Sequence, residues 1–418
     1  MKTTPILLLL LFVLPTVSEA QMQWYQNQDA GTPPPSGTFG NCVKKFTAHS
    51  FVACYQWNSE NELYTWKISK SHVNGTEQRS ILLSGTWASV EMRVGRYNSL
   101  YVLLRSFPIG SSAEFTVYKL DSNLVIQRQQ TISLPGSFSI INVNTFDTDD
   151  DGYLYLAGDG SYVMGPESHP ASFIMKADRN LNRRWLQVDS TETSFTQVAV
   201  DPSGLVTVIE DYYLTYPDIR IRRYNARGEL MNVQSFAPDP GRFNLFAKLD
   251  NGGNLLLYGG KLIGDTAQGM YICKLSRSNG RVIYNRTLFP TAGFQLQDLA
   301  QDENGRIFTL VTKYENSGEQ VSVVARLLSQ NGALSWQQEL PFSSDSVVLT
   351  KLVTGSSNRI YAVGFRRNTE YFSKGIAYRF LKTGQRDGSF NGPDSINSQR
   401  NHALVDGMLD NDDQLISV

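Results

Sequence analysis

The sequence predicts an all-β fold made of one unit of four short strands that repeats along most of the chain. Two observations support this prediction. Short apolar or alternating segments, each bounded by Asp, Asn and Gly, follow one another along the chain. A strand-like segment with a basic residue at its third position also recurs about every 52 residues. No window shows a sustained 3.6-residue period, so helical repeats are excluded.

The first element along the chain is a predicted signal peptide over residues 1–20. Its apolar run, Ile6–Leu14, is too short to cross a bilayer as a helix. Ser18 and Ala20 are small residues that suit a cleavage site. We therefore expect a secreted, extracellular protein with no membrane span, whose single domain covers residues 21–418.

The second strand of each repeat is predicted from a turn followed by an apolar run. The turns contain Asp, Asn and Gly, which accept positive φ and bond their own backbone. The β-branched and aromatic residues that follow suit a strand that is buried on both faces. This pattern begins at Asp151, Asp201, Asn251, Asn304 and Asn358.

The third strand carries the clearest register mark, a Lys or Arg flanked by apolar residues. The basic residue falls at Lys67, Lys119, Lys176, Arg223, Lys274, Arg326 and Arg379. A second turn and a last strand follow, with an aromatic residue in copies such as Trp185 and Trp336. The series has two interpretations: a ring that binds anions, or long side chains that cover apolar surface and reach water or nearby acids. We favour the second.

A unit of about fifty residues with four short strands predicts one blade of a β-propeller. The predicted fold is a single propeller of four-stranded antiparallel blades, with eight blades, or seven as the alternative. The eighth blade is split between the chain ends: His402–Asp406 and Gln414–Ser417 resemble the first two strands of a blade, and Gln23–Gln26 resembles a last strand. Such closure removes free sheet edges. A series of β-sandwiches is the rival, but the sequence lacks the linkers that it needs.

Two segments resemble known propeller repeats of the SBBP and delta-sixty kind. Asp151–Gly158 matches their strand motif DGxIYVAG, and Arg379–Gly392 is similar to the following segment, RLNxDGxxDxxFG. The last strands that contain Trp are also similar to those of quinoprotein-like propellers. The resemblance implies the fold, but such repeats occur in proteins of many functions, so it implies no activity.

The acidic run Asp147–Gly152 predicts a calcium site. Asp147, Asp149 and Asp151 have the D-x-D-x-D-G spacing of a calcium loop, in which alternate carboxylates converge on one hard cation. Calcium is the one cofactor that the sequence suggests. The acid that would complete an EF-hand loop is replaced by Gly158, which leaves an ordinary solvated turn as the alternative.

Cysteines and sequons suggest covalent modifications. Cys42 and Cys54 flank a predicted hairpin turn, so we expect them to face each other and to form a disulfide, with Cys273 left over. The alternative is that all three are small buried apolar residues. Asn74 and Asn285 begin N-x-Thr sequons and are predicted glycosylation sites if the source is eukaryotic.

Composition and motifs favour a binding protein. The net charge is −1 and the charges are spread along the chain, which argues against a nucleic-acid partner and against a polybasic membrane patch. The sequence has no Gly-x-Ser-x-Gly elbow, no nucleotide-binding loop and no local pair of His ligands. We therefore expect a secreted, non-enzymatic binding or scaffold protein that contacts an extracellular protein or glycan.

The predicted contact surface consists of loops between second and third strands. Gly160–Ser172 and Tyr212–Asp218 are long and rich in Tyr and Pro, and Tyr212 and Tyr213 are the candidate binding residues. Two other functions remain open. A secreted enzyme, either a carbohydrate-active hydrolase or lyase or a quinoprotein-like oxidoreductase, would place its site at the central channel. A protein associated with the extracellular matrix would use the fold as a scaffold.

Overall fold

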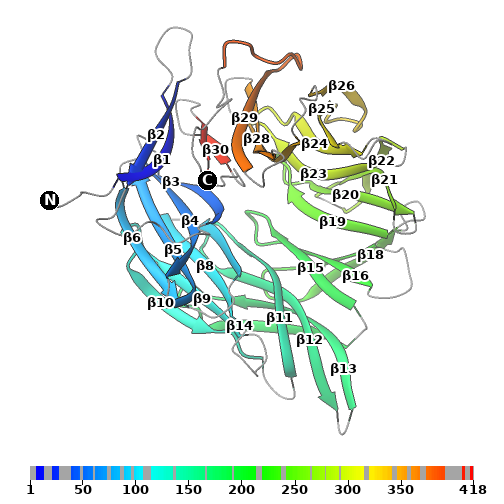
Figure 1. Ribbon diagram of the computed structural model, residues 1–418. Coiled ribbons are helices and arrows are strands. Elements are labelled where there is room, and N and C mark those ends of the chain that lie inside the picture. The colour runs from blue at the N-terminus through cyan, green and yellow to red at the C-terminus, as the bar shows by residue number, and fades with distance from the viewer. Residues whose placement is uncertain are drawn as a thin grey trace, which may run out of the picture. The chain divides into compact units, whose positions relative to one another are not determined.

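The elements of the protein are β-strands, as the computed structural model shows (Figure 1). The structure describes residues 6–13, 21–27, 39–47, 50–59, 62–72, 77–84, 89–95, 98–106, 114–134, 138–164, 167–190, 193–212, 219–236, 242–263, 266–277, 279–290, 293–314, 320–340, 346–354, 359–367, 373–390, 407–409 and 415–417. Within these residues, no helix is long and apolar enough to cross a membrane. The chain divides into two compact units, each described separately below. The first unit contains residues 1–84, 258–273 and 283–418, and the second contains residues 85–257 and 274–282.

The second unit holds blades 2, 3 and 4, each a sheet of four antiparallel strands in chain order. Blade 2 consists of β7 (Ser89–Gly95), β8 (Ser99–Ser106), β9 (Glu114–Leu120) and β10 (Ile126–Thr131). Blade 3 consists of β11 (Phe138–Thr148), β12 (Leu154–Met164), β13 (Glu167–Ala177) and β14 (Arg183–Asp189). Blade 4 consists of β15 (Thr193–Val200), β16 (Val206–Tyr212), β17 (Ile219–Tyr224) and β18 (Leu230–Phe236).

The first unit holds blades 1, 6 and 7. Blade 1 consists of β3 (Phe39–Thr47), β4 (Ser50–Ser59), β5 (Glu62–His72) and β6 (Glu77–Ser84). Blade 6 consists of β23 (Phe294–Gln301), β24 (Ile307–Tyr314), β25 (Gln320–Leu327) and β26 (Leu334–Glu339). Blade 7 consists of β27 (Ser346–Thr354), β28 (Arg359–Arg367) and β29 (Ser373–Leu381). An isolated bridge between Phe380 and Arg386 extends blade 7 beyond its third strand.

The strands of blade 5 are divided between the two units. They are β19 (Arg242–Leu249), β20 (Leu255–Ile263), β21 (Thr266–Leu275) and β22 (Val282–Leu288). Within the first unit, β21 also pairs in parallel with β23 through Gln268 and Phe294. The repeated four-stranded antiparallel sheet confirms the unit that the sequence predicts.

The two ends of the chain add a pair of short sheets to the first unit. β1 (Ile6–Val13) pairs with β2 (Gln21–Asn27), and β30 (Gly407–Leu409) pairs with β31 (Leu415–Ser417). β30 contacts both β27 and β3, and β31 contacts β1. These are separate two-stranded sheets, so a split eighth blade stays a prediction, as does removal of residues 1–20.

Tight turns join the first and second strands of a blade. In blade 4, the N–H of Asp201 donates to the carbonyl of Leu205 (3.1 Å), and the N–H of Gly204 donates to the carbonyl of Asp201 (2.9 Å). The Asp201 carboxylate accepts the N–H groups of Ser203 and Leu205 at 2.8 and 3.1 Å. Gly204 has a φ of 78°, which favours glycine. Asp250 and Asp302 begin turns of the same kind, which explains the repeated Asp and Gly.

The first strand carries a β-bulge in several blades. In blades 3 and 7 a glycine lies opposite the bulge. A Cβ atom at Gly158 would lie 1.8 Å from the Asn142 carbonyl oxygen, and one at Gly364 would lie 2.0 Å from that of Val348. The bulges in these two blades therefore require glycine. Register shifts mark the bulges between Gly40 and Cys42, Val143 and Thr145, Phe195 and Gln197, Leu296 and Asp298, and Leu349 and Lys351.

Candidate functional site

The repeated basic residues of the third strands contact turns of the following blade. In the second unit, Lys119 Nζ donates to the carbonyl of Arg179 at 2.8 Å, and Arg223 Nη2 donates to the carbonyl of Ser276 at 3.2 Å. Lys176 Nζ lies 3.4 Å from the carbonyl oxygen of Ala226. Each acceptor belongs to the turn between the third and fourth strands of the following blade. These residues therefore tie one blade to the next, rather than forming a ring of free cations.

The same basic positions also neutralise acids at the turns between first and second strands. Lys274 Nζ lies 2.6 Å from Asp250 Oδ2. Burial alone would raise the pKa of Asp250, but the hydrogen bonds from Lys274 and Asn254 outweigh it and hold that pKa below its usual range. Asp250 is therefore a charged anchor for its own turn at neutral pH.

The three acids of the predicted calcium loop have three different sets of partners. Asp149 Oδ1 accepts the N–H of Tyr153, and its Oδ2 accepts the Tyr155 hydroxyl, each at 2.9 Å. The carboxylate of Asp147 accepts the N–H of Val200 at 2.9 Å. The exposed Asp151 has Arg179 Nη2 3.8 Å away. No group of three His, Cys, Asp or Glu side chains in the described ranges is arranged to hold a metal ion, and calcium stays a prediction.

Asp147 and Asp149 act as structural acceptors. Removal of the Asp147 carboxyl from water raises its pKa, although the N–H groups of Val200 and Thr148 act in the opposite direction. Because Val200 lies on β15, this carboxyl joins the inner strands of blades 3 and 4. Asp149 instead closes its own turn and lies 3.9 Å from Lys176 Nζ.

An aromatic residue of the last strand packs on the turn of the following blade. In blade 3, Trp185 Nε1 donates to the carbonyl of Ala226 at 3.1 Å. Its ring centroid lies 6.1 Å from that of Tyr155 and 6.4 Å from that of Tyr224. A Cβ atom at Gly228 would lie 2.6 Å from Trp185 Cδ2, so the ring needs a glycine beneath it.

This contact, which we call the inter-blade latch, recurs in the first unit. Trp336 Nε1 donates to the carbonyl of Lys382 at 3.0 Å, and a Cβ atom at Gly384 would lie 2.7 Å from that indole. Tyr284 covers Gly332 in the same way, at 2.6 Å. The latches are therefore Trp185 on Gly228, Tyr284 on Gly332 and Trp336 on Gly384.

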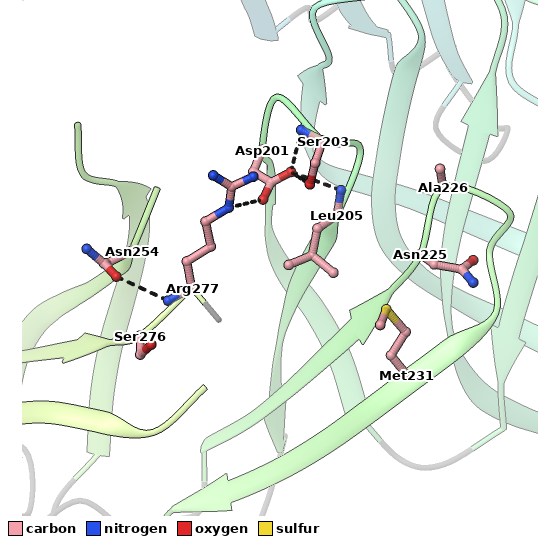
Figure 2. Close-up of a pocket in the computed structure, with 9 residues that line it drawn as sticks. All are labelled: Asp201, Ser203, Leu205, Asn225, Ala226, Met231, Asn254, Ser276 and Arg277. Atoms are coloured by element: carbon pink, nitrogen blue, oxygen red, sulfur yellow. Dashed lines mark hydrogen bonds and ion pairs between the residues drawn. The ribbon is translucent and has the colours of Figure 1, made fainter. Parts of the chain in front are cut away.

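A hollow of about 480 Å³ lies between blade 4 and the turns of blade 5 that belong to the second unit (Figure 2). We call it the 4/5 hollow. Its volume falls in the range of roughly 300–1,000 Å³ that is usual for ligand pockets. Blade 4 lines it with Asp201, Ser203, Leu205, Asn225, Ala226 and Met231. Blade 5 lines it with Asn254, Ser276 and Arg277. Figure 2 shows Arg277 and Ser276 on one side, opposite Asn225, Ala226 and Met231.

An ion pair crosses the 4/5 hollow. Arg277 Nε donates to Asp201 Oδ2 at 2.7 Å, and Asp201 Oδ1 accepts the Ser203 hydroxyl at 2.6 Å. Burial alone would raise the pKa of Asp201, but the hydrogen bonds from Ser203, Leu205 and Arg277 outweigh it and lower that pKa. The Asp201 side chain is 3% exposed and that of Arg277 is 41% exposed, so the guanidinium is the accessible partner.

A second polar cluster surrounds Asp159 in blade 3. Asn142 Nδ2 donates to Asp159 Oδ1 at 3.0 Å. Asn144 Nδ2 and the Ser194 hydroxyl donate to Asp159 Oδ2 at 2.7 and 2.5 Å. Asn144, which sits in the bulge of β11, also donates to the carbonyl of Phe195 on β15 at 3.1 Å. The bond from Ser194 to this buried acid and the bond from Asn144 to Phe195 both run between blades, so the cluster ties blade 3 to the first strand of blade 4.

One of the two predicted contact loops differs from the structure. The loop expected over Gly160–Ser172 is wrong, because β12 continues to Met164 and β13 begins at Glu167. Cross-strand pairs run from Gly160 with Ala171 out to Met164 with Glu167, so backbone pairing continues where the sequence suggested a loop. Of the candidate binding residues, Tyr212 ends β16 opposite Thr193, and Tyr213 lies outside the described residues.

The predicted covalent sites fall on strands where they are described. Cys42 and Cys54 are direct cross-strand partners of β3 and β4, as the hairpin prediction requires, and their disulfide stays a prediction. Cys273 is buried, which raises the pKa of its thiol to about 11. Asn285 is exposed on β22, and Asn74 lies outside the described residues. Glycosylation at both stays a prediction.

Two solved structures are similar to this chain in fold. A prolyl endopeptidase chain is 11% identical, with a TM-score of 0.53, over 88% of this chain and 49% of that chain. The β-propeller domain of the Trilobed protease from Pyrococcus furiosus is 8% identical, with a TM-score of 0.49, over 88% of this chain and 100% of that domain. The chain thus spans about half the length of the endopeptidase, and the likeness concerns the fold alone.

The repeated four-stranded antiparallel sheets make the chain a β-propeller. No protein-family model and no curated protein sequence matches it. The resemblance to SBBP, delta-sixty and quinoprotein-like repeats therefore stays a prediction beyond the fold that they share.

Sequence reasoning missed the 4/5 hollow. Asp201 was recognised only as a turn residue, and Arg277 carried no signal because its pairing with Asp201 joins two turns that are distant in sequence. The last strand of blade 4 has Asn232 where that of blade 3 has Trp185, but blades 1 and 2 also lack an aromatic residue there, with Leu82 and Arg128, so this difference does not mark the hollow.

Proposed function

We propose that the protein is a secreted binding or scaffold propeller that holds an extracellular polypeptide at the 4/5 hollow. The observation that carries this proposal is the hollow itself. It combines apolar walls, Leu205 and Met231, with an accessible guanidinium at Arg277. Pockets of this composition suit recognition, in which apolar contact supplies affinity and a few polar groups set orientation. Secretion is supported by the signal-peptide pattern of residues 1–20.

The surface beside the hollow supports a polypeptide partner. On β18, the side chains of Leu230, Met231 and Val233 are 49%, 63% and 44% exposed. Contiguous exposed apolar side chains are typical of interaction sites. β18 is also the outer strand of blade 4, so its free edge offers backbone groups to an extended segment.

Contacts around the 4/5 hollow fix the turns that line it, which suits a scaffold role. The contact from Arg223 to Ser276 and the ion pair of Lys274 with Asp250 both fix the turns of blade 5. Residues held in this way lose little freedom when a partner binds, which favours affinity.

Photo-crosslinking tests the binding function. The secreted chain would carry a benzoyl-phenylalanine at Met231 or, as a matched control, at Ile126, an exposed residue of the outer strand of blade 2. A partner that crosslinks from position 231 only would be purified and titrated. We expect Met231→Arg to weaken that binding at least tenfold and Ile126→Arg to leave it unchanged.

Three outcomes would overturn the proposal. Equal binding by Met231→Arg and the parent chain would exclude the 4/5 hollow as the contact site. Chemical conversion of the partner by the chain would identify an enzyme instead. N-terminal sequencing of protein from the medium tests secretion separately, because retention of residues 1–20 would contradict the signal peptide.

A further inference from the structure

The guanidinium of Arg277 is held in the 4/5 hollow through one of its three nitrogens. Its Nε donates to Asp201, as Figure 2 shows, and among the residues that the structure describes its two Nη atoms have no hydrogen-bond partner. The backbone N–H of Arg277 donates to Asn254 Oδ1 at 3.1 Å, so the main chain is fixed as well. Arg277 therefore has a positioned pair of Nη donors that a ligand in the hollow can use.

Arg179 of blade 3 is the counterpart of Arg277 and is bound differently. Both side chains lie over the glycine in the first turn of their own blade. Arg179 Cγ lies 3.6 Å from the position of a Cβ atom at Gly152, and Arg277 Cδ lies 2.9 Å from that at Gly253. Arg179 is neutralised locally, because its Nε donates to the carbonyl of Asp151 and its Nη2 lies 3.8 Å from that carboxylate.

Blade 5 lacks the acid that neutralises Arg179. Directly before the turn glycine, blade 3 has Asp151 and blade 5 has Gly252. Arg277 instead binds Asp201, which belongs to the turn of the preceding blade. This one difference between the two turns places the Arg277 side chain along the 4/5 hollow.

Asp201 does not saturate the positive charge at this end of the hollow. Its Oδ1 is occupied by Ser203 and Leu205, and only its Oδ2 binds Arg277. A second guanidinium, that of the buried Arg223, is also close. Burial lowers the pKa of Arg223, and the charge of Asp201 acts in the opposite direction. One carboxylate therefore lies near two guanidiniums, which favours an anionic ligand.

The opposite wall of the hollow is apolar. Ala226 and Met231 lie across from Arg277 in Figure 2, and the Met231 side chain is 63% exposed. The acid that follows the turn on this wall, Glu229, accepts a hydrogen bond from Asn225 at 2.6 Å and does not line the hollow. A ligand that fits both walls combines an anionic group with an adjacent apolar group.

We propose that the 4/5 hollow binds a carboxylate of the partner polypeptide through the two Nη groups of Arg277, with a neighbouring apolar side chain of the partner against Met231. This inference rests on the proposed binding function and specifies its ligand. A carboxylate accepts two parallel N–H bonds from a guanidinium, and such charge-assisted bonds are stronger than neutral ones. A polypeptide carries this group on Asp and Glu side chains and at its C-terminus, and the test distinguishes these two sources.

The test uses the full chain and an array of random hexapeptides, each made with an amidated and with a free C-terminus. A side-chain carboxylate would enrich the bound peptides in an acidic residue beside an apolar one. A terminal carboxylate would enrich the free-acid form. Fluorescence polarisation then compares the best peptide with its counterpart in which that carboxylate is a carboxamide. We expect the counterpart to bind about tenfold more weakly.

Variants of the two arginines assign this preference to the hollow. Arg277→Gln removes the Nη pair's charge and should reduce the tenfold preference to less than twofold. Arg277→Lys keeps a cation but not the planar fork, so a preference of a few-fold should remain. Arg179→Gln is the matched control, because Arg179 is 51% exposed and lies outside the hollow, and it should keep the full preference.

The outcomes separate this inference from the proposed function. An array without bound peptides, bound peptides without a carboxylate preference, or a preference that Arg277→Gln retains would each overturn the carboxylate site. Crosslinking of a partner from position 231 would still decide the binding function. Circular dichroism would show whether each variant is folded. If Arg277→Gln does not fold, Arg277→Lys takes its place, and an unchanged tenfold preference would overturn the inference.

Discussion

The inter-blade latch predicts a measurable contribution of Trp185 to stability. Trp185→Ala removes one hydrogen bond to Ala226, which contributes about 1 kcal/mol. It also removes two aromatic contacts, with Tyr155 and Tyr224, of roughly 0.5–1.5 kcal/mol each. A fully buried Trp→Ala change costs about 3–5 kcal/mol, and Trp185 is only half-buried. We therefore expect a loss of about 2–3 kcal/mol. Trp185→Phe keeps most ring contacts, loses the donor and should cost about 1 kcal/mol.

A double-mutant cycle with Gly228→Ala tests whether the ring and the turn are in contact. Gly228 has a φ of 84°, so alanine there costs about 1–2 kcal/mol of backbone strain in any background. Its Cβ atom would also lie 2.6 Å from Trp185 Cδ2, a clash that exists only while the indole is present. The double variant should therefore be more stable than the sum of the single losses predicts, by about 1–2 kcal/mol.

Urea unfolding monitored by circular dichroism measures these differences through the transition midpoint. Val188→Ala is the control on the same strand, because its side chain is 44% exposed and the change should be within about 0.5 kcal/mol. Additivity of Trp185→Ala and Gly228→Ala within about 0.5 kcal/mol would refute the latch.

The remaining predictions concern the acidic turns and the thiols. Asp149→Ala should cost about 1–2 kcal/mol, because both carboxylate oxygens accept hydrogen bonds. A calcium-dependent rise in the thermal midpoint of the parent, absent from this variant, would support the calcium prediction. Protein unfolded without reductant should show one reactive thiol, Cys273, if Cys42 and Cys54 are bonded, whereas three would contradict the disulfide. In the native state at pH 8, Cys273 should stay unreactive, because burial raises its pKa to about 11. The pKa of Asp250 is lower in the folded than in the unfolded chain, so its stabilisation is present above about pH 4 and is lost on further acidification. Asp250→Asn should therefore flatten the acid limb of a stability–pH curve, and an unchanged limb would contradict this assignment.

Local chemistry made the strands and turns predictable. The turn at Asp201 is determined by a carboxylate that binds its own backbone and by a glycine at positive φ, and both are visible within a few residues. The third-strand series was visible for the same reason. The calcium motif shows the limit of local patterns. The spacing of Asp147, Asp149 and Asp151 suits a metal loop, but Val200 and Tyr155, which bind two of these acids, cannot be assigned from that spacing.

The candidate site was not predictable, because it depends on pairs that are distant in sequence. Trp185 was seen as a repeated feature, but its partner Gly228 lies in the next blade. The hairpin over Gly160–Ser172 was missed because its Gly and Pro residues suggest a loop, whereas the two strands satisfy each other's backbone groups. The 4/5 hollow was missed for the same reason, because its lining comes from turns that are distant in sequence, such as those of Asp201 and Arg277.

The latches also give the chain a direction of assembly. In the part of the chain that the structure describes, each one joins an aromatic residue on one blade to a glycine on the blade that follows. A chain opened between blades 3 and 4 would therefore have unlike ends: an N-terminal fragment that presents the uncovered indole of Trp185, and a C-terminal fragment that presents the bare turn at Gly228. Since repeat units are stabilised by their immediate neighbours, such fragments should recombine in one order only. In a circular permutant with its new termini at this junction, Trp185 and Gly228 would no longer be close in sequence. Their contact would then depend on the linker that joins the original termini.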